Sequence, residues 1–319
     1  MQVFRSIEAA KNRFSSVVVT IGNFDGVHLG HRKLISQAQN LAKSLNSHLL
    51  IVTFEPHPVK VLAPEKFIKR LYSEEDMIRQ LQNLDVDGLL IVPFTKELSK
   101  WSARRFFESC ILSPNPLAGV VVGYDFVFGA DRSGNVENLK KWVGEIGAEF
   151  RVVEAQKNDS EVIYSSTKIR HALLIGDVER ATGFLGRPFS LAGEVIQGDQ
   201  RGRQIGFPTA NLILPEDQLV PRFGVYLTRV LVDEESYLAV TNIGQRPTFK
   251  DDHRVYVESH IVDVEINLYN KNIRVQLLHF LREEKKFKQV SELVEQIKAD
   301  IQMARRLFSS RFEEQNPYN

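Results

Sequence analysis

The stretch VVVTIGNFDGVHLGHRKLISQAQNLAKSL, residues 17–45, decides the fold of the first half of the chain. Its first five residues are all β-branched, so they predict a buried strand. A glycine-rich turn follows the strand. Beyond the turn, apolar side chains recur at helical spacing, at Leu34, Ala38, Leu41 and Leu45. Strand, tight turn and helix in this order are typical of the opening unit of a parallel α/β sheet.

The same alternation continues toward the middle of the chain. Further strands are predicted at 49–54, 89–92, 119–122 and 151–153, and amphipathic helical stretches around 77–84, 102–111 and 136–146. Repeated strand and helix predict a Rossmann-like, doubly wound parallel sheet. Ligands of such sheets collect at the carboxyl ends of the strands, so we expect chemistry in the loops after Ile21, Phe54 and Val122.

The alternation stops near GFLGRP, residues 183–188, and we place a domain boundary there, giving domains 1–183 and 184–319. Strands are predicted beyond it at 191–196, 225–232, 238–243, 255–261 and 273–280. Turn residues between them favour a small antiparallel β-barrel. One closing helix is predicted from apolar residues at helical spacing: Val290, Leu293, Val294, Ile297, Ile301 and Ala304.

Composition narrows the class of protein. Lys and Arg number 41 against 40 Asp and Glu, so no strong field gathers nucleic acid or an anionic membrane. The single cysteine, Cys110, excludes an internal disulfide and fits a reducing compartment. The first residues lack the apolar core of a secretion signal, and no apolar stretch approaches the roughly 20 residues of a membrane span. We expect a cytoplasmic protein without nucleic-acid or membrane partners; the sequence leaves its oligomeric state open.

IGNFDGVHLGH, residues 21–31, is the first candidate site. Its glycines allow close backbone approach, and His28 and His31 lie three residues apart where the helix begins. A helix N-terminus offers unpaired N–H groups and a positive dipole end, which suits a triphosphate. Imidazoles add donors for charge that develops on a leaving pyrophosphate. One such glycine or histidine alone would be explained as a turn or surface residue, but the whole string predicts a nucleotide site.

Three further segments of the first half carry candidate groups. YSSTKIRHALL, residues 164–174, places hydroxyls at the start of a helix, where capping alone explains them, and Arg170 just inside it. Paired with the histidine string, these donors predict a clamp on the β- and γ-phosphates. TFEPHP at 53–58 and VGYDFVFGADRSGN at 122–135 follow predicted strands. Their glycines and prolines also suit ordinary loops, yet Asp125 and Arg132 are charged groups at a strand exit.

GEVIQGDQRGRQIGFPTANL, residues 193–212, predicts a second, different phosphate site. Its four glycines suit a flexible loop over phosphates, although such loops alone are weak evidence. Thr209 and Asn211 lie two residues apart and share one side of an extended segment. A hydroxyl and an amide oxygen placed together are typical hard ligands of Mg2+, whereas the alternative is a turn that they merely satisfy.

VYVESHIVDVEINLYNK, residues 255–271, supplies a candidate base. A neutral alcohol is a poor nucleophile until its proton has an acceptor, so a kinase acting on an alcohol needs one. Glu258 lies in an alternating strand and shares a face with Tyr256 and His260. A solvated strand glutamate is the ordinary alternative, and the local sequence alone does not exclude it.

In this order, GNFDGVHLGH, TFEPHP, GYDFVFG and SSTKIR resemble the adenylyltransferase module of bacterial bifunctional riboflavin kinase/FAD synthetases. The HxGH and SSTxxR pair is similar to that of the wider nucleotidyltransferase superfamily. An aminoacyl-tRNA synthetase is the alternative there, but its KMSKS-type loop is missing from this sequence. GxxRGRxxGFPTAN, GVY at 224–226, NIGQRPTF at 242–249, VESH and FLREEKKF at 280–287 resemble the riboflavin kinase module.

The first resemblance implies transfer of AMP from ATP to FMN, which gives FAD and pyrophosphate. It implies catalytic roles for His28, His31 and Arg170. Further ATP contacts are implied for Gly22, Phe24, Asp25, Gly26, Ser166 and Thr167. The flavin or adenine side is implied to involve Phe54, Pro56, His57, Pro58, Asp125 and Arg132.

The second resemblance implies phosphorylation of riboflavin to FMN with Glu258 as base and with Thr209 and Asn211 holding Mg2+. Further ATP contacts are implied for Gly193, Gly198, Gly202, Arg203, Gly206 and Pro208. Flavin contacts are implied for Tyr226 and Arg282. Two alternatives remain from the sequence: a riboflavin kinase whose first domain is not catalytic, and a flavin-responsive binding or regulatory protein built on enzyme modules.

Overall fold

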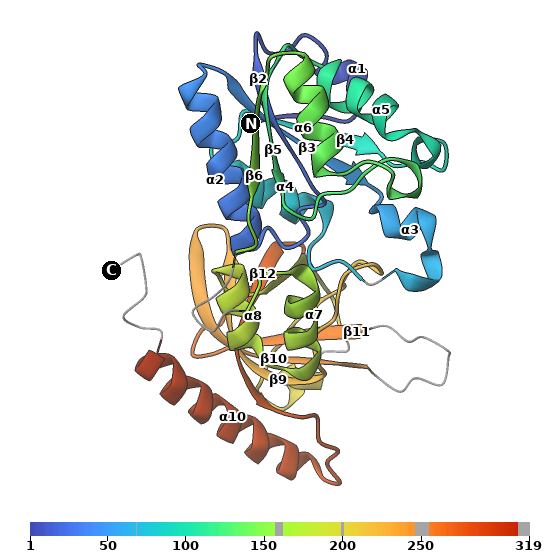
Figure 1. Cartoon of the computed structure of the whole chain (residues 1–319). Helices are drawn as coiled ribbons and strands as arrows, with labels where there is room; N and C mark the ends of the chain where they lie inside the picture. Colours follow the sequence, from blue (N-terminus) through green and yellow to red (C-terminus); the bar gives the residue numbers. More distant parts are fainter. Residues whose placement is uncertain (68, 157–161, 199–200, 246–254, 312–319) are drawn as a thin grey trace. The chain divides into compact units, whose positions relative to one another are not determined.

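The computed structural model describes residues 1–67, 69–156, 162–198, 201–245 and 255–311 (Figure 1). The chain divides into two compact units, Met1–Ser166 and Thr167–Asn319. Within the described residues, no helix is long and apolar enough to cross a membrane.

Six parallel strands form the sheet of the first unit, in the order β1-β4-β3-β2-β5-β6. Their bounds are β1 Gln2–Phe4, β2 Val17–Ile21, β3 His48–Glu55, β4 Gly88–Pro93, β5 Leu117–Gly123 and β6 Glu149–Val153. The predicted parallel sheet is confirmed. The edge strand β1 was not predicted, because three residues are too few to produce a recognisable pattern.

Helices cover both faces of this sheet, which makes it doubly wound (Figure 1). Along β2, Val17, Val19 and Ile21 belong to one apolar cluster and Val18 to the other. The helices are α1 Ile7–Ala10, α2 Leu29–Ser44, α3 Pro58–Leu62, α4 Glu74–Gln82, α5 Ala103–Phe106 and α6 Val136–Glu145. A π-helical turn, η3 Phe107–Leu112, extends α5, and short 3-10 turns lie at η1 Pro64–Lys66, η2 Leu98–Lys100 and η4 Ala130–Arg132.

The strand order places a topological switch at β2. The chain runs from β2 to β3 and β4 on one side, and then returns to β5 and β6 on the other side. In open α/β sheets, the crevice outside the carboxyl ends of the strands at such a switch is where ligands bind. The loops that follow Ile21 and Gly123 both leave the sheet at this point.

The second unit contains a closed antiparallel barrel in the order β10-β11-β8-β7-β12-β9, as predicted. The strands are β7 Ser190–Ile196, β8 Ala210–Leu212, β9 Gly224–Val232, β10 Glu235–Gln245, β11 Val255–Ile261 and β12 Asn272–Arg282. The predicted closing helix is α10 Val290–Arg311, whose Ile301 and Ala304 pack with Val225, Leu227 and Val240 of the barrel wall. A short helix, α9 Arg201–Gln204, lies in the glycine-rich segment.

Two helices, α7 Ser166–Ile175 and α8 Val178–Leu185, precede the barrel. The carbonyl of Leu173 accepts a hydrogen bond from the Arg222 amide at 2.9 Å, and the Glu179 carboxylate is hydrogen-bonded to Nδ1 of His279 on β12. The second compact unit therefore includes α8 and all of α7 except its first residue. The domain boundary after residue 183 stays a prediction.

Candidate active sites

The loop between β2 and α2 has a strained backbone. Phe24, Gly26 and Val27 all have positive φ angles, of 49°, 88° and 40°. Glycine adopts such an angle freely, but it is a genuine outlier for a β-branched residue such as Val27, and each strained non-glycine residue costs about 1–3 kcal/mol. The Val27 amide donates to the Phe24 carbonyl at 3.1 Å, and the Phe24 side chain is fully buried. Packing therefore holds this predicted phosphate loop in one conformation.

His28 closes the N-terminus of α2. Its Nδ1 accepts a hydrogen bond from the backbone N–H of His31 at 3.3 Å. In the neutral ring this fixes the proton on Nε2, which makes Nε2–H the donor. The two imidazoles stack with centroids 3.7 Å apart and an interplanar angle of 17°. The predicted pair of histidines is therefore one ordered cluster at a helix N-terminus.

Burial, and then the neighbouring His28 imidazole, lower the pKa of His31 well below its usual 6.5. His31 is therefore neutral near pH 7. Its Nδ1 is buried and has no hydrogen-bond partner among the residues that the structure describes. An unpaired buried polar atom is costly and uncommon, so it marks His31 as a group prepared for a ligand.

The start of the SSTxxR string contacts the histidine loop. Ser166 Oγ donates to the Asp25 carbonyl at 2.7 Å, and the Asp25 carboxylate accepts from the Leu71 amide at 3.0 Å. Asp25 is 4% exposed, so its carboxylate fixes the loop from inside. Thr167 and Arg170 follow on α7 in the second compact unit, and their roles stay predictions.

The segment after β3 is well packed. The Phe54 ring lies 5.8 Å from Phe94 and 5.9 Å from Phe106, so it belongs partly to the core. Pro56 lies in the turn, and Pro58 begins α3, which His57 caps by accepting from the Val59 amide at 3.2 Å. The sequence prediction that this segment binds flavin or adenine stays a prediction.

The loop after β5 carries the two predicted charged groups. Asp125 and Arg132 are both exposed. The loop folds close to α5, because a Cβ on Gly129 would lie 2.7 Å from the backbone of Ala103. Since this loop leaves the sheet at the switch point, its exposed charges lie on a segment where substrate contacts are expected.

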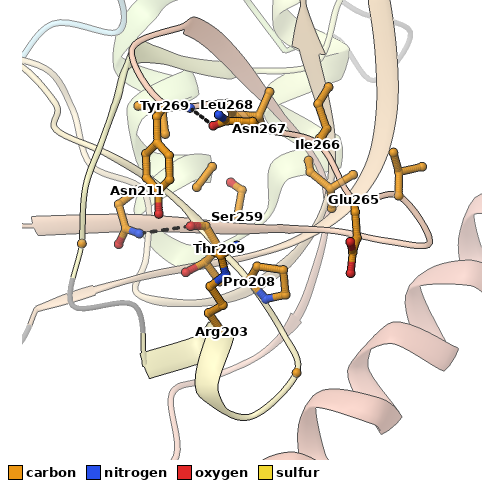
Figure 2. A pocket seen from close by; sticks show the side chains of 16 residues that line it. Arg203, Pro208, Thr209, Asn211, Ser259, Glu265, Ile266, Asn267, Leu268 and Tyr269 are labelled. Atoms are coloured by element: carbon orange, nitrogen blue, oxygen red, sulfur yellow. Dashed lines mark hydrogen bonds between the residues drawn. The ribbon is translucent and has the colours of Figure 1, made fainter.

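A cavity of about 480 Å3 lies in the second unit (Figure 2). Six predicted ATP-binding residues of this half line it: Gly198, Arg203, Gly206, Pro208, Thr209 and Asn211. Figure 2 shows Thr209 and Asn211 on one side, with the segment 265–269 across from them. Gly193 and Gly202 are absent from the lining. They instead permit close packing, since a Cβ on Gly202 would lie 2.3 Å from the Phe207 carbonyl oxygen.

Asn211 is the best-defined candidate ligand in this cavity. It is 6% exposed, and its Nδ2 donates to the Thr209 carbonyl at 3.3 Å. Its Oδ1 is buried without a hydrogen-bond partner among the described residues. A Cβ on Gly198 would lie 2.7–2.9 Å from the Asn211 amide, so only glycine permits this approach. A buried, unpaired, neutral oxygen is chemically suited to a hard cation such as Mg2+.

Glu258 lies directly beside Asn211. The two residues are register partners on β11 and β8, so their half-buried and buried side chains share one face. Val257 and Ser259 point to the opposite side and are buried, and it is Ser259, not Glu258, that contributes to the cavity lining. The face shared with His260 also fixes the PTAN segment, because His260 Nδ1 lies 2.9 Å from the Pro208 carbonyl oxygen.

The structure gives the two predicted flavin residues other contacts. Tyr226 is fully buried, donates its hydroxyl to the Arg222 carbonyl and packs edge-on against Phe280 at 5.1 Å. Burial raises the pKa of its phenol. Arg282 donates to the Asp300 carboxylate of α10 through Nε at 2.9 Å and Nη2 at 2.7 Å. Their roles in flavin binding stay predictions, and residues 246–249 of the NIGQRPTF string lie outside the described residues.

Sequence reasoning missed one wall of the cavity. The segment 264–269 lines it, including Glu265, Asn267 and Tyr269. The side chain of Asn267 accepts a hydrogen bond from the Tyr269 amide at 3.1 Å. Its place in the sequence could have indicated this wall, because the segment closely follows the strand that carries the candidate base.

Comparisons with known proteins match the two halves of the chain to two different families. A family model described as FAD synthetase matches residues 10–168, and one described as riboflavin kinase matches residues 185–308. A curated Bacillus subtilis protein is 37% identical over 94% of this chain and 95% of its own length. An Escherichia coli K12 protein is 38% identical over 91% of this chain and 92% of its own length. Both are named bifunctional riboflavin kinase/FMN adenylyltransferase.

A solved structure has the same architecture. It is a Streptococcus pneumoniae chain described as a macrolide-efflux protein, with a TM-score of 0.85 and 31% identity. The match covers 95% of this chain and 98% of that one.

Proposed function

The chain belongs to the family of bifunctional riboflavin kinase/FMN adenylyltransferases, and from this premise we propose how the residues described above divide the two reactions. The second half phosphorylates riboflavin to FMN with ATP. The first half transfers AMP from a second ATP to FMN, which gives FAD and pyrophosphate.

In the kinase half, ATP occupies the 480 Å3 cavity with its phosphates near Thr209 and Asn211. The observation that carries this assignment is the buried Asn211 Oδ1, which has no partner among the described residues. The Thr209 hydroxyl and Asn211 Oδ1 would hold Mg2+, which when bound neutralises phosphate charge. Arg203 is exposed at the same cavity and adds a positive charge toward the phosphates.

Glu258 accepts the proton of the riboflavin 5′-hydroxyl. As that oxygen forms its bond to the γ-phosphorus, the bond between this phosphorus and the bridging oxygen breaks, and ADP leaves with the electron pair. The register pairing of Glu258 with Asn211 supports this role, because it puts the base beside the proposed metal ligand.

In the adenylyltransferase half, an FMN phosphate oxygen attacks the α-phosphorus of ATP. The attacking group is already anionic, so no protein base is needed, and the task is to orient and neutralise two polyanions. His28, His31 and the N-terminus of α2 receive the ATP phosphates. Ser166, Thr167 and Arg170 are proposed to close over them. Asp125 and the segment 54–58 are proposed to contact the flavin or adenine.

We place both reactions in the cytoplasm, and the single cysteine supports a reducing compartment. The alternatives are a kinase with a non-catalytic first domain and a regulatory flavin-binding protein. The ordered His28–His31 cluster argues against the first. The cavity argues against the second, because the Asn211 oxygen that lines it has no partner among the residues the structure describes.

A product assay on the purified chain tests the proposal. Riboflavin, Mg2+ and ATP are supplied, and FMN, FAD, ADP and pyrophosphate are followed in time. We expect one ADP for each flavin phosphorylated and one pyrophosphate for each FAD. FMN without FAD from a folded chain would support the kinase-only alternative, and flavin binding without either product would support a regulatory protein.

A further inference from the structure

Helix α7 begins against the histidine loop of the proposed adenylyltransferase site. Its first residue, Ser166, donates through Oγ to the Asp25 carbonyl at 2.7 Å. Tyr164, just before the helix, lies beside the first turn of α2, because a Cβ on Gly30 would lie 3.4 Å from the Tyr164 Cβ. Arg170 follows about one turn after Ser166 on the same helix. The position of α7 therefore governs donors that the proposed function assigns to the ATP phosphates.

The other end of α7 is capped by an arginine of the barrel. The last four carbonyls of a helix have no partner within that helix. The backbone N–H of Arg222 donates to the Leu173 carbonyl at 2.9 Å, and its Nη1 donates to the Ile175 carbonyl at 3.2 Å. Arg222 lies just before β9, and its positive charge also suits the negative end of the helix dipole. Both the backbone and the side chain of Arg222 thus hold the last turn of α7.

Arg222 is itself fixed to the barrel wall. Its guanidinium forms an ion pair with Glu283, which follows β12, and its Cζ lies 5.2 Å from the centroid of the Phe280 ring. The Arg222 carbonyl accepts a hydrogen bond from the Tyr226 hydroxyl. On the other side, a Cβ on Gly176, at the end of α7, would lie 3.2 Å from the Arg222 Cδ. Arg222 therefore connects the end of α7 to strands β9 and β12.

One continuous helix joins the residue that Arg222 holds to the residue that is proposed to hold ATP. Helix α7 has 10 residues, and backbone hydrogen bonds connect its turns. A shift of its last turn is therefore passed on to Arg170, and a displacement of about 1 Å far from the chemistry can cost 100-fold in rate. Resting on the proposed function, we infer that Arg222 is a positioning residue for FMN adenylylation, which acts by fixing the helix that carries Arg170.

The chemical step itself is unchanged by this role. The FMN phosphate oxygen still attacks the α-phosphorus of ATP, and pyrophosphate leaves with the electron pair. Arg222 acts only through α7, whose proposed donors contact ATP and not FMN. Loss of the Arg222 guanidinium should therefore weaken the use of ATP in adenylylation and leave the binding of FMN nearly intact.

Arg222→Met tests the inference, because methionine keeps an apolar chain against the Phe280 ring but has no N–H donor. We expect kcat/KM for ATP in FMN adenylylation to fall about 10-fold, and KM for FMN to stay within about 2-fold of wild type. Arg222→Lys keeps a cation that can donate to the Ile175 carbonyl, so it should recover part of the loss. Hydrogen exchange of the α7 amides should accelerate in Arg222→Met and less so in Arg222→Lys.

Riboflavin phosphorylation by the same protein separates positioning from a merely structural role. Arg222 belongs to the compact unit that contains the barrel, so a general disturbance of this unit would lower kinase activity first. We expect kcat and KM of the kinase reaction to be unchanged in Arg222→Met. Arg305→Ala is the matched control, since Arg305 also forms an exposed ion pair in this unit, with Asp263, but lies on α10. It should keep wild-type adenylylation.

Wild-type adenylylation by Arg222→Met, or an equal loss of both activities, would overturn the inference. Arg170→Ala, alone and combined with Arg222→Met, separates this result from the proposed function. In the Arg170→Ala background, Arg222→Met should have little further effect, because its action passes through the same helix. If Arg170→Ala impairs adenylylation and Arg222→Met does not, only the inference fails. If Arg170→Ala is fully active, the proposed role of Arg170 is wrong and the inference fails with it.

Discussion

The His28 imidazole lies against the first turn of its own helix, over Gly30. A Cβ on Gly30 would lie 3.1 Å from both Nδ1 and Cε1 of the His28 ring. Glycine is otherwise a poor residue inside a helix, where alanine is favoured by about 1 kcal/mol. The glycine of the HxGH string is therefore explained by the space that the first histidine needs.

Gly30→Ala should consequently impair FMN adenylylation. Its methyl group displaces the His28 ring, so we expect kcat to fall by about 10–100-fold. This fall should not exceed the fall in kcat that removal of one oriented hydrogen-bond donor causes. Riboflavin phosphorylation should be unchanged. The matched control is Gly144→Ala in α6, where an added Cβ meets nothing within 4 Å. Wild-type FAD synthesis by Gly30→Ala would show that the position of His28 is unimportant.

Gly198→Ala should weaken the kinase through Asn211. The new methyl group would lie 2.7–2.9 Å from the Asn211 amide and must push it away from the cavity. We expect the Mg2+ concentration for half-maximal riboflavin phosphorylation to rise about 10-fold, which corresponds to about 1.4 kcal/mol. Gly183→Ala in α8, where a Cβ meets nothing within 4 Å, is the control. An unchanged Mg2+ dependence would remove Asn211 from the metal site.

The lowered pKa of His31 predicts a pH dependence of stability. Below about pH 6.5, the unfolded chain binds a proton at His31 that the folded chain does not. Neutral His31 therefore contributes to the free energy of unfolding above pH 6.5. This contribution is lost as the pH falls, by at most about 1.4 kcal/mol per pH unit. Between pH 7.5 and 5.5, wild type should lose about 1 kcal/mol more unfolding free energy than His31→Asn.

Tryptophan fluorescence during urea unfolding measures this, because Trp101 and Trp142 both lie in the first compact unit. Equal losses in wild type and His31→Asn would contradict the lowered pKa and the neutral state of His31.

The Arg282–Asp300 pair should anchor α10 to the barrel. The two side chains are only 16% and 7% exposed, so Arg282→Ala leaves a buried Asp300 carboxylate that still accepts a hydrogen bond from Gln296 Nε2 at 2.9 Å. Breaking a buried pair costs about 3–5 kcal/mol. Hydrogen exchange of α10 amides should accelerate strongly. Lys298→Ala breaks an exposed pair within the same helix and should have little effect. Unchanged exchange in Arg282→Ala would contradict the anchoring role.

The sequence predicted long, regular elements better than short ones. The β-branched run of β2 and the helical spacing in α2 carry their own signals, so both were predicted. Strands β1 and β8 have three residues each, and their pairing depends on distant partners that no local pattern records. The π-helical turn after α5 was read as ordinary helix, because its apolar spacing resembles that of an α-helix.

Candidate site residues were predicted where a side chain with suitable chemistry stands in a recognisable sequence motif, as His28 and Asn211 do. The same reasoning could not decide which way an amphipathic side chain points. Tyr226 has an aromatic ring suited to a flavin, yet it is fully buried in the barrel. The wall at 264–269 is irregular and carries no periodic signal, so only the folded chain brings it to the cavity.

The central claim is that the two reactions use separate sites, and paired single variants test it most directly. Glu258→Gln should make no FMN but should convert supplied FMN to FAD. His31→Ala should make FMN but little FAD. An equal mixture of the two variants, given riboflavin and ATP with Mg2+, should again produce FAD. Loss of both activities in either folded variant, or no FAD from the mixture, would contradict the account.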